Sequence, residues 1–129
     1  MDWLLMIQAE GEDKKSFIKN RKQLTEAIFD EMIKTIRGCG AQSLFVYISS
    51  PLAMSKNNPK EEKPAEEFFE QFCKKRDIPY LFTRTYFNML KQKGVPLKKE
   101  GHWDAQGNQI IAQVIAGYLD KAVMRSTSQ

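Results

Sequence analysis

The chain has 129 residues, 42% of them hydrophobic, which is the size and composition of one compact domain with a core of its own. Its 20 Lys and Arg against 16 Asp and Glu give a formal charge of +4, but basic and acidic residues are interleaved, which favours a mixed solvated surface over a nucleic-acid interface. The first residues lack the pattern of a signal peptide and no stretch has the length of a membrane span, so no membrane partner is expected and the cellular location stays open.

Apolar patterns predict strands and a helix in the first part of the chain. Residues 3–8 form a short apolar run that is typical of a buried strand. A helix should follow, because apolar side chains recur at spacings of four and seven, at Phe17, Leu24, Ile28, Met32 and Ile36. The glycines on both sides of Cys39 should end it. Residues 43–49 are rich in apolar strand-forming side chains and predict a strand that is buried on both faces.

The second part of the chain repeats this alternation. Residues 50–64 hold three prolines and predict a loop. Pro64 suits the first turn of a helix whose apolar face is Ala65, Phe68, Phe69, Phe72 and Cys73. Residues 78–83 predict a third strand, and residues 84–94 predict a short helix or an irregular segment. Asp104 suits the N-cap of a last helix with the apolar stripe Ile111, Val114, Ile115, Tyr118 and Leu119, and residues 124–129 should fray.

Three successive strand and helix pairs predict an α/β fold in a single domain over residues 1–123. Such units form a parallel sheet, here of about three strands, with right-handed crossovers and helices on its faces. A free-standing parallel sheet usually has more strands, and the strand at residues 3–8 would leave an apolar edge. We therefore expect a second copy of the chain, in a homodimer, or a preceding segment to complete the sheet.

Cysteine and glycine patterns give no support for a metal or a cofactor. Cys39 and Cys73 lie far apart, and His102 is the single histidine of the chain, so no zinc site is expected. Cys73 falls on an apolar helix face, which predicts a buried free thiol. The sequence has no glycine-rich phosphate loop, and we expect no nucleotide cofactor.

Open parallel sheets bind their ligands outside the carboxyl ends of the strands. The loops expected at that edge carry polar side chains from three parts of the chain: Glu12, Asp13, Ser49, Ser50, Glu100 and His102. A single histidine beside a tryptophan is either a catalytic base or a packed structural side chain. Its place at the functional edge strengthens the catalytic interpretation of His102 until the two interpretations are equally supported.

The stretch GHWDAQGNQIIAQVIAGYL at residues 101–119 resembles the last motif block of the SGNH (GDSL-like) hydrolases, in which an acid and a histidine precede a glycine and a closing amphipathic helix. The resemblance implies a flavodoxin-like three-layer α/β/α domain, of which this chain would be the carboxyl-terminal half. It makes His102 the general base of a Ser-His-Asp triad, which takes the serine proton and returns it to the leaving group. It also places Gly11, Glu12 and Asp13 at the oxyanion block.

Several residues depart from the pattern of that family. The acid commonly found three residues before the histidine would be Lys99, so only Glu100 can orient His102. Glu12 stands where the oxyanion block has an asparagine, and an ionised carboxylate would repel an oxyanion. The frequent asparagine after the tryptophan is Asp104.

The nucleophile block of the family, G-D-S, is absent from the sequence. Ser49 and Ser50 end a predicted central strand, but no glycines flank them to form a nucleophile elbow. We interpret them as turn-forming serines before Pro51, with a nucleophilic role as the alternative.

By resemblance the sequence is expected to encode the carboxyl-terminal portion of an ester hydrolase or acyl-transfer domain, with the histidine base but without the serine. Its substrate would be a small-molecule or polymer-linked ester, and Trp103 would lie beside it. The alternative is a non-catalytic α/β interaction module, or a decayed remnant, whose sheet edge a partner covers. The basic run at residues 91–99 is either a solvated face or a contact for an anionic substrate.

Overall fold

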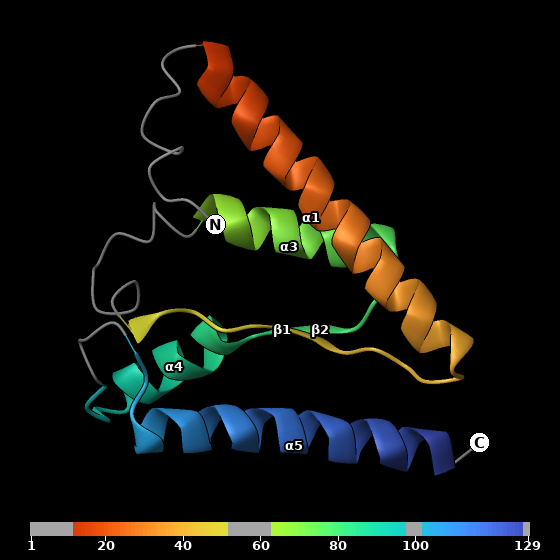
Figure 1. Ribbon diagram of the computed structural model, residues 1–129. Coiled ribbons are helices and arrows are strands. Elements are labelled where there is room, and N and C mark those ends of the chain that lie inside the picture. Colours follow the sequence, from red (N-terminus) through yellow and green to blue (C-terminus); the bar gives the residue numbers. More distant parts are fainter. Residues whose placement is uncertain (1–11, 52–62, 98–101, 128–129) are drawn as a thin grey trace. The chain divides into compact units, whose positions relative to one another are not determined.

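The computed structural model describes residues 12–51, 63–97 and 102–127. In these residues the chain forms four helices and two strands (Figure 1), in the order α1 (Glu12–Gly38), β1 (Phe45–Tyr47), α3 (Lys63–Lys75), β2 (Tyr80–Phe82), α4 (Thr83–Gln92) and α5 (Ala105–Thr127). The chain divides into two compact units, residues 1–43 and residues 44–129. Helix α1 belongs to the first unit, and both strands and the other helices belong to the second.

Three helices end in the same hydrogen-bonded motif. After α1, Gly40 takes a positive φ of 72°, its N–H donates to the Arg37 carbonyl at 2.9 Å, and the Ala41 N–H donates to the Ile36 carbonyl at 3.1 Å. The ends of α3 and α4 repeat these two bonds around Asp77 and Gly94, which also have positive φ. This is the Schellman motif, which satisfies the last carbonyls of a helix. The predicted glycine stop after α1 is confirmed.

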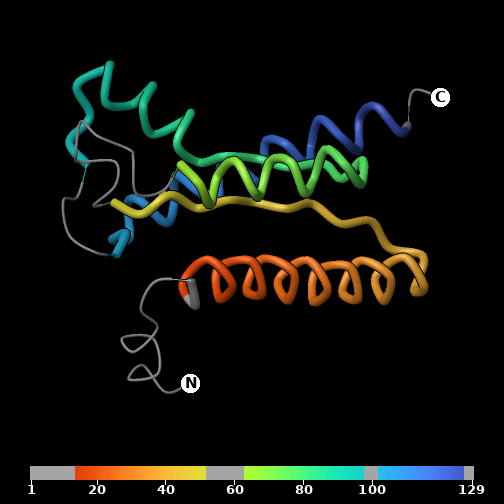
Figure 2. The backbone as a smooth tube through the Cα atoms, turned by 90° about the horizontal axis from the view of Figure 1, so that it is seen from above, coloured from red at the N-terminus to blue at the C-terminus, as the bar shows by residue number. Residues whose placement is uncertain are grey.

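The sheet of the second unit is a single parallel pair, with Phe45 opposite Tyr80 and Tyr47 opposite Phe82. Helix α3 runs along this pair in both views (Figures 1 and 2) and packs its aromatic face on it. The Phe72 ring stacks on Phe45 with centroids 5.9 Å apart, and Phe69 meets Tyr47 and Phe82 edge to face at 5.4 and 5.3 Å. These contacts confirm the apolar face predicted for residues 65–73.

Helices α4 and α5 pack against each other and enclose a second apolar cluster. Phe87 of α4 and Ile111 of α5 are its buried centre, and Leu90, Trp103 and Ile115 pack around them. The segment left open in the sequence as helix or irregular is therefore a helix. Helix α5 continues to Thr127, so residues 124–127, expected to fray, are helical.

The flavodoxin-like three-layer α/β/α fold, inferred with about three parallel strands, is wrong. Helix makes up 72% of the described residues, and the sheet they form has two strands of three residues each. The strand expected at residues 3–8 lies outside the described residues. Strand β2 is short because Pro79, which has no N–H, precedes it and α4 begins directly after Phe82.

No described helix combines the length and the apolar character that a bilayer span requires.

Candidate functional site

A shallow hollow of about 450 Å³ lies where β1 has ended and α5 begins. It is lined by two segments that are far apart in the sequence. Ile48, Ser49, Ser50 and Pro51 follow β1, and His102, Trp103, Asn108 and Ile111 come from the start of α5 and the turn before it. The structure thus brings the predicted serines and the histidine to one place, on the carboxyl side of β1.

Trp103 fixes the position of this turn. Its indole Nε1–H donates to the Ser49 carbonyl oxygen at 2.8 Å. Its ring stacks on Phe87 with a centroid distance of 4.0 Å and an interplanar angle of 8°, and Phe87 is completely buried. A ring held both by a hydrogen bond and by a buried aromatic partner has little freedom to move. The backbone of His102, one residue earlier, is therefore held beside the end of β1.

Asp104 starts α5 directly after this turn. Its carboxylate oxygen Oδ1 accepts the Gly107 N–H at 2.9 Å, and its carbonyl accepts the Asn108 N–H at 2.9 Å. The first bond is that of an N-cap residue, which accepts one of the helix donors that lack an intrahelical partner. The predicted capping role of Asp104 is confirmed. The residue that departs from the asparagine of the SGNH pattern thus has a structural task here.

A polar network connects the residues that follow the two strands with α3. The backbone N–H of the fully buried Ser49 donates to the hydroxyl of Thr83 at 3.0 Å. The Ser49 hydroxyl donates to Glu66 Oε1 at 3.4 Å, and Arg84 Nε donates to the same oxygen at 2.6 Å. This network connects the end of β1, α3 and the start of α4, and it holds Ser49, its one member that lines the hollow.

The predicted site residues fall into three groups. His102 is exposed in the hollow, with Ser50 and Trp103 half-buried beside it, and Ser49 is buried beneath them. Glu12 and Asp13 are the first residues of α1, in the other unit. Glu100, the proposed orienting acid, and Gly11 lie outside the described residues.

This arrangement favours proton transfer by His102 over nucleophilic attack by Ser49. The exposed imidazole of His102 can exchange protons with a bound molecule. The Ser49 hydroxyl is buried and directed at a carboxylate, so it is not presented to a substrate as a nucleophile must be. Within the described ranges, no three His, Cys, Asp or Glu side chains gather in a way that could hold a metal ion.

Sequence reasoning missed Thr83, Glu66 and Arg84. Thr83 and Arg84 follow β2 as Ser49 and Ser50 follow β1, and the parallel register of the strands would have indicated that they meet. No pattern in the sequence distinguishes Glu66 from the neighbouring acids of α3, because its role depends on how that helix packs.

Neither a protein-family model, nor a curated protein, nor a solved structure was found to match this chain.

Proposed function

We propose that this chain supplies the general-base histidine of an ester hydrolase or acyl-transfer site whose nucleophile lies outside the 129 residues. The observation that carries the proposal is the place of His102: an exposed imidazole, on a turn fixed by the Trp103 to Ser49 hydrogen bond, at the mouth of a hollow. The likeness of residues 101–119 to the SGNH histidine block supports it. The proposal concerns this site and does not depend on a three-layer fold.

In this site His102 would take the proton of an attacking hydroxyl and return it to the leaving alcohol. The walls of the hollow combine apolar surface from Ile48, Pro51 and Ile111 with the polar side chains of Ser50 and Asn108. Such a lining suits a small acyl group and the polar ester bond beside it, on a free or polymer-linked substrate. Glu100 would hold the imidazole in its productive tautomer.

The test uses the natural polypeptide that includes the coding sequence directly upstream of Met1, and this chain alone where a stop codon precedes it. Hydrolysis of p-nitrophenyl acetate and covalent labelling by a fluorophosphonate are measured. We expect a labelled serine outside residues 1–129 and a loss of kcat of about a hundredfold or more in His102→Ala, the usual range for a general base.

Lys75→Ala is the control, because Lys75 is exposed and does not line the hollow. It should leave kcat unchanged. Absence of both label and turnover would show that the hydrolase proposal is wrong, and the non-catalytic interaction module would replace it. Turnover that survives His102→Ala would show that this histidine is not the base.

A further inference from the structure

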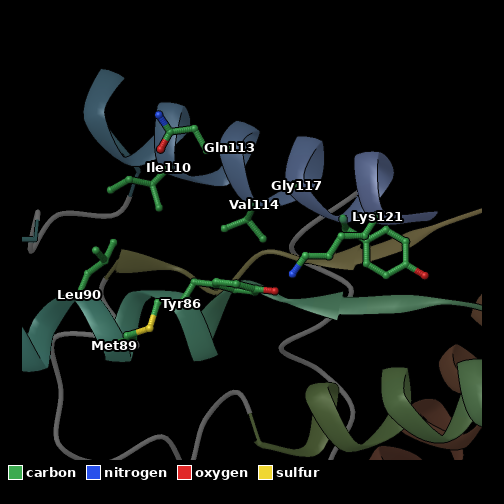
Figure 3. A pocket seen from close by; sticks show the side chains of 9 residues that line it. Tyr86, Met89, Leu90, Ile110, Gln113, Val114, Gly117 and Lys121 are labelled. Carbon is green, nitrogen blue, oxygen red and sulfur yellow. The ribbon is translucent and has the colours of Figure 1, made fainter. Parts of the chain in front are cut away.

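A second cavity of about 350 Å³ runs between α4 and α5 (Figure 3) and shares no residue with the hollow around His102. Its apolar walls are Met89 and Leu90 of α4 and Ile110 and Val114 of α5, which Figure 3 shows facing one another. Gly117 and four polar or charged side chains complete the lining: Tyr86, Gln113, Tyr118 and Lys121. Nothing in the proposed function uses this groove.

The groove follows from the spacing of residues on the two helices. Tyr86, Met89 and Leu90 recur at i, i+3 and i+4 on α4, and Ile110, Val114, Gly117 and Lys121 recur at i, i+4, i+7 and i+11 on α5, so each set shares one helix face. Gly117 creates the open space, because a Cβ built there meets no heavy atom within 4 Å. A trough is therefore left between Val114 and Lys121, where a larger residue would fill the gap.

Charge distinguishes one end of this groove from the rest. The side chain of Lys121 extends from α5 over the groove, and its ammonium and the Tyr86 hydroxyl point to the same region in Figure 3. Among the described residues that line the groove, none is an aspartate or glutamate; Asp120 precedes Lys121 but does not belong to the lining. An apolar trough with one cation and a phenol at its end complements an amphiphile with a single anionic head.

We propose that the α4–α5 groove binds a linear acyl chain with a carboxylate head. The tail lies between Leu90, Ile110 and Val114, and the carboxylate accepts hydrogen bonds from Lys121 and from the Tyr86 hydroxyl. From Ile110 to Lys121 the α5 face is about 16 Å long at the rise of an α-helix, which suits an extended chain of medium length. If the groove instead takes an apolar peptide or a second copy of the chain, its occupant needs no anionic group. A neutral amphiphile should then bind as tightly as one with a carboxylate head, so comparing the two tests the proposal.

The experiment titrates the full ¹⁵N-labelled chain with decanoate, with decanol and with acetate, and follows the backbone amide signals by NMR. We expect decanoate to shift the amides of Leu90, Val114 and Gly117, to bind more tightly than decanol, and acetate to leave these signals in place. Lys121→Gln should weaken decanoate binding about threefold to fivefold, the range of an exposed ion pair, and leave decanol binding unchanged. Gly117→Leu should weaken both amphiphiles about tenfold or more, because its side chain fills the trough.

Two control variants keep the test specific. Lys75→Gln removes an exposed cation of α3 that does not line the groove, and Ala116→Leu enlarges an exposed residue of α5 next to Gly117 but outside the lining. Both should bind decanoate like the natural chain. The proposal is overturned if decanoate does not shift the groove amides, if decanol binds as tightly as decanoate, or if Lys75→Gln weakens binding as much as Lys121→Gln.

Discussion

Gly107, in the first turn of α5, lies directly against Trp103. A Cβ at this position would lie 2.7 Å from Trp103 Cε3 and 3.0 Å from Trp103 Cβ. The ring cannot move aside easily, because it stacks on Phe87 and donates to the Ser49 carbonyl. Glycine is thus required here by close approach, although it is a weak helix former.

We expect Gly107→Ala to destabilise the fold by about 1–3 kcal/mol, as overpacking of a filled site does. Gly117→Ala on the same helix is the matched comparison, because no heavy atom lies within 4 Å of its added Cβ. It should stabilise the fold by about 0.5–1 kcal/mol through helix propensity. Urea unfolding followed by circular dichroism measures both changes, and midpoints that shift in the same direction would contradict the interpretation.

The two cysteines should differ sharply in reactivity. Cys73 is fully buried, and this burial raises the pKa of its thiol from 9.0 to about 11, with a smaller opposing effect of Arg76. Cys39 is exposed in the turn after α1. Because the thiolate is the reactive form, a disulfide reagent at pH 8 should modify Cys39 rapidly and Cys73 only after unfolding. Rapid modification of two thiols in the folded chain would show that Cys73 is accessible.

The same pKa shift has a consequence for stability in alkaline solution. The folded state favours the neutral thiol of Cys73, so its contribution is fully present below pH 9 and is lost as the pH rises toward 11. Melting temperatures of the natural chain and Cys73→Ala, measured across this range, should converge as the pH rises. Parallel curves would contradict this prediction.

The Glu66 carboxylate is the polar connection between α3 and the residues that follow the strands. Its ion pair with Arg84 is 2.6 Å long, and the two side chains are only 19% and 18% exposed. The neighbouring pair of Glu67 and Lys63 is 3.8 Å long, with side chains 57% and 69% exposed. Water screens the second pair far more than the first.

Glu66→Ala should therefore cost about 2 kcal/mol of stability, since Arg84 and the Ser49 hydroxyl both lose this carboxylate. Glu67→Ala is the control, at the next position of the same helix, and should change stability by less than about 0.5 kcal/mol. Urea denaturation gives the free energy of unfolding of each variant for this comparison. Equal losses would mean that helix propensity or net charge, rather than the Ser49–Glu66–Arg84 network, determines the effect.

The elements differ in how far the sequence could predict them. The helices follow from local periodicity, and the Phe68, Phe69 and Phe72 face packs as expected. The sequence predicts longer strands than the structure has, because the apolar runs extend beyond the residues that pair between β1 and β2. Thr83 illustrates the reason: the pattern of residues 78–83 predicts it at the end of a strand, yet it starts α4 and its hydroxyl accepts the Ser49 N–H. Periodicity also cannot give the number of strands that pair, which led to the wrong fold class.

The candidate site was predictable only where its residues follow predicted elements. His102, Ser49 and Ser50 were expected at one edge because they lie after a strand or before a helix, and they line one hollow. Glu66 could not be found, since its contact with Ser49 spans 17 residues and depends on the packing of α3. The pairing of Glu100 with His102 stays a prediction, as Glu100 is outside the described residues.

The expected homodimer stays a prediction, and α1 gives it a physical reason other than a strand at residues 3–8. Leu24, Ile28 and Met32 lie on one face of α1 and are 62%, 50% and 49% exposed. Burying such a half-exposed side chain would stabilise a dimer by about 1 kcal/mol, which gives roughly 6 kcal/mol for three side chains on each of two copies. Association itself costs about 4 kcal/mol or more. Pairing through this face would therefore be weak and visible only in concentrated solution.

Light scattering over a wide concentration range tests this expectation, with Ile28→Lys as the variant and Gln23→Lys as the control. Both substitutions add one positive charge to α1, and position 23 is exposed and polar. Only Ile28→Lys places that charge within the apolar face, where pairing would bury it. We expect the mean mass of the natural chain and of Gln23→Lys to rise with concentration while Ile28→Lys stays monomeric. A monomeric mass for all three at every concentration would exclude pairing through α1, and equal association of all three would assign the interface to another surface.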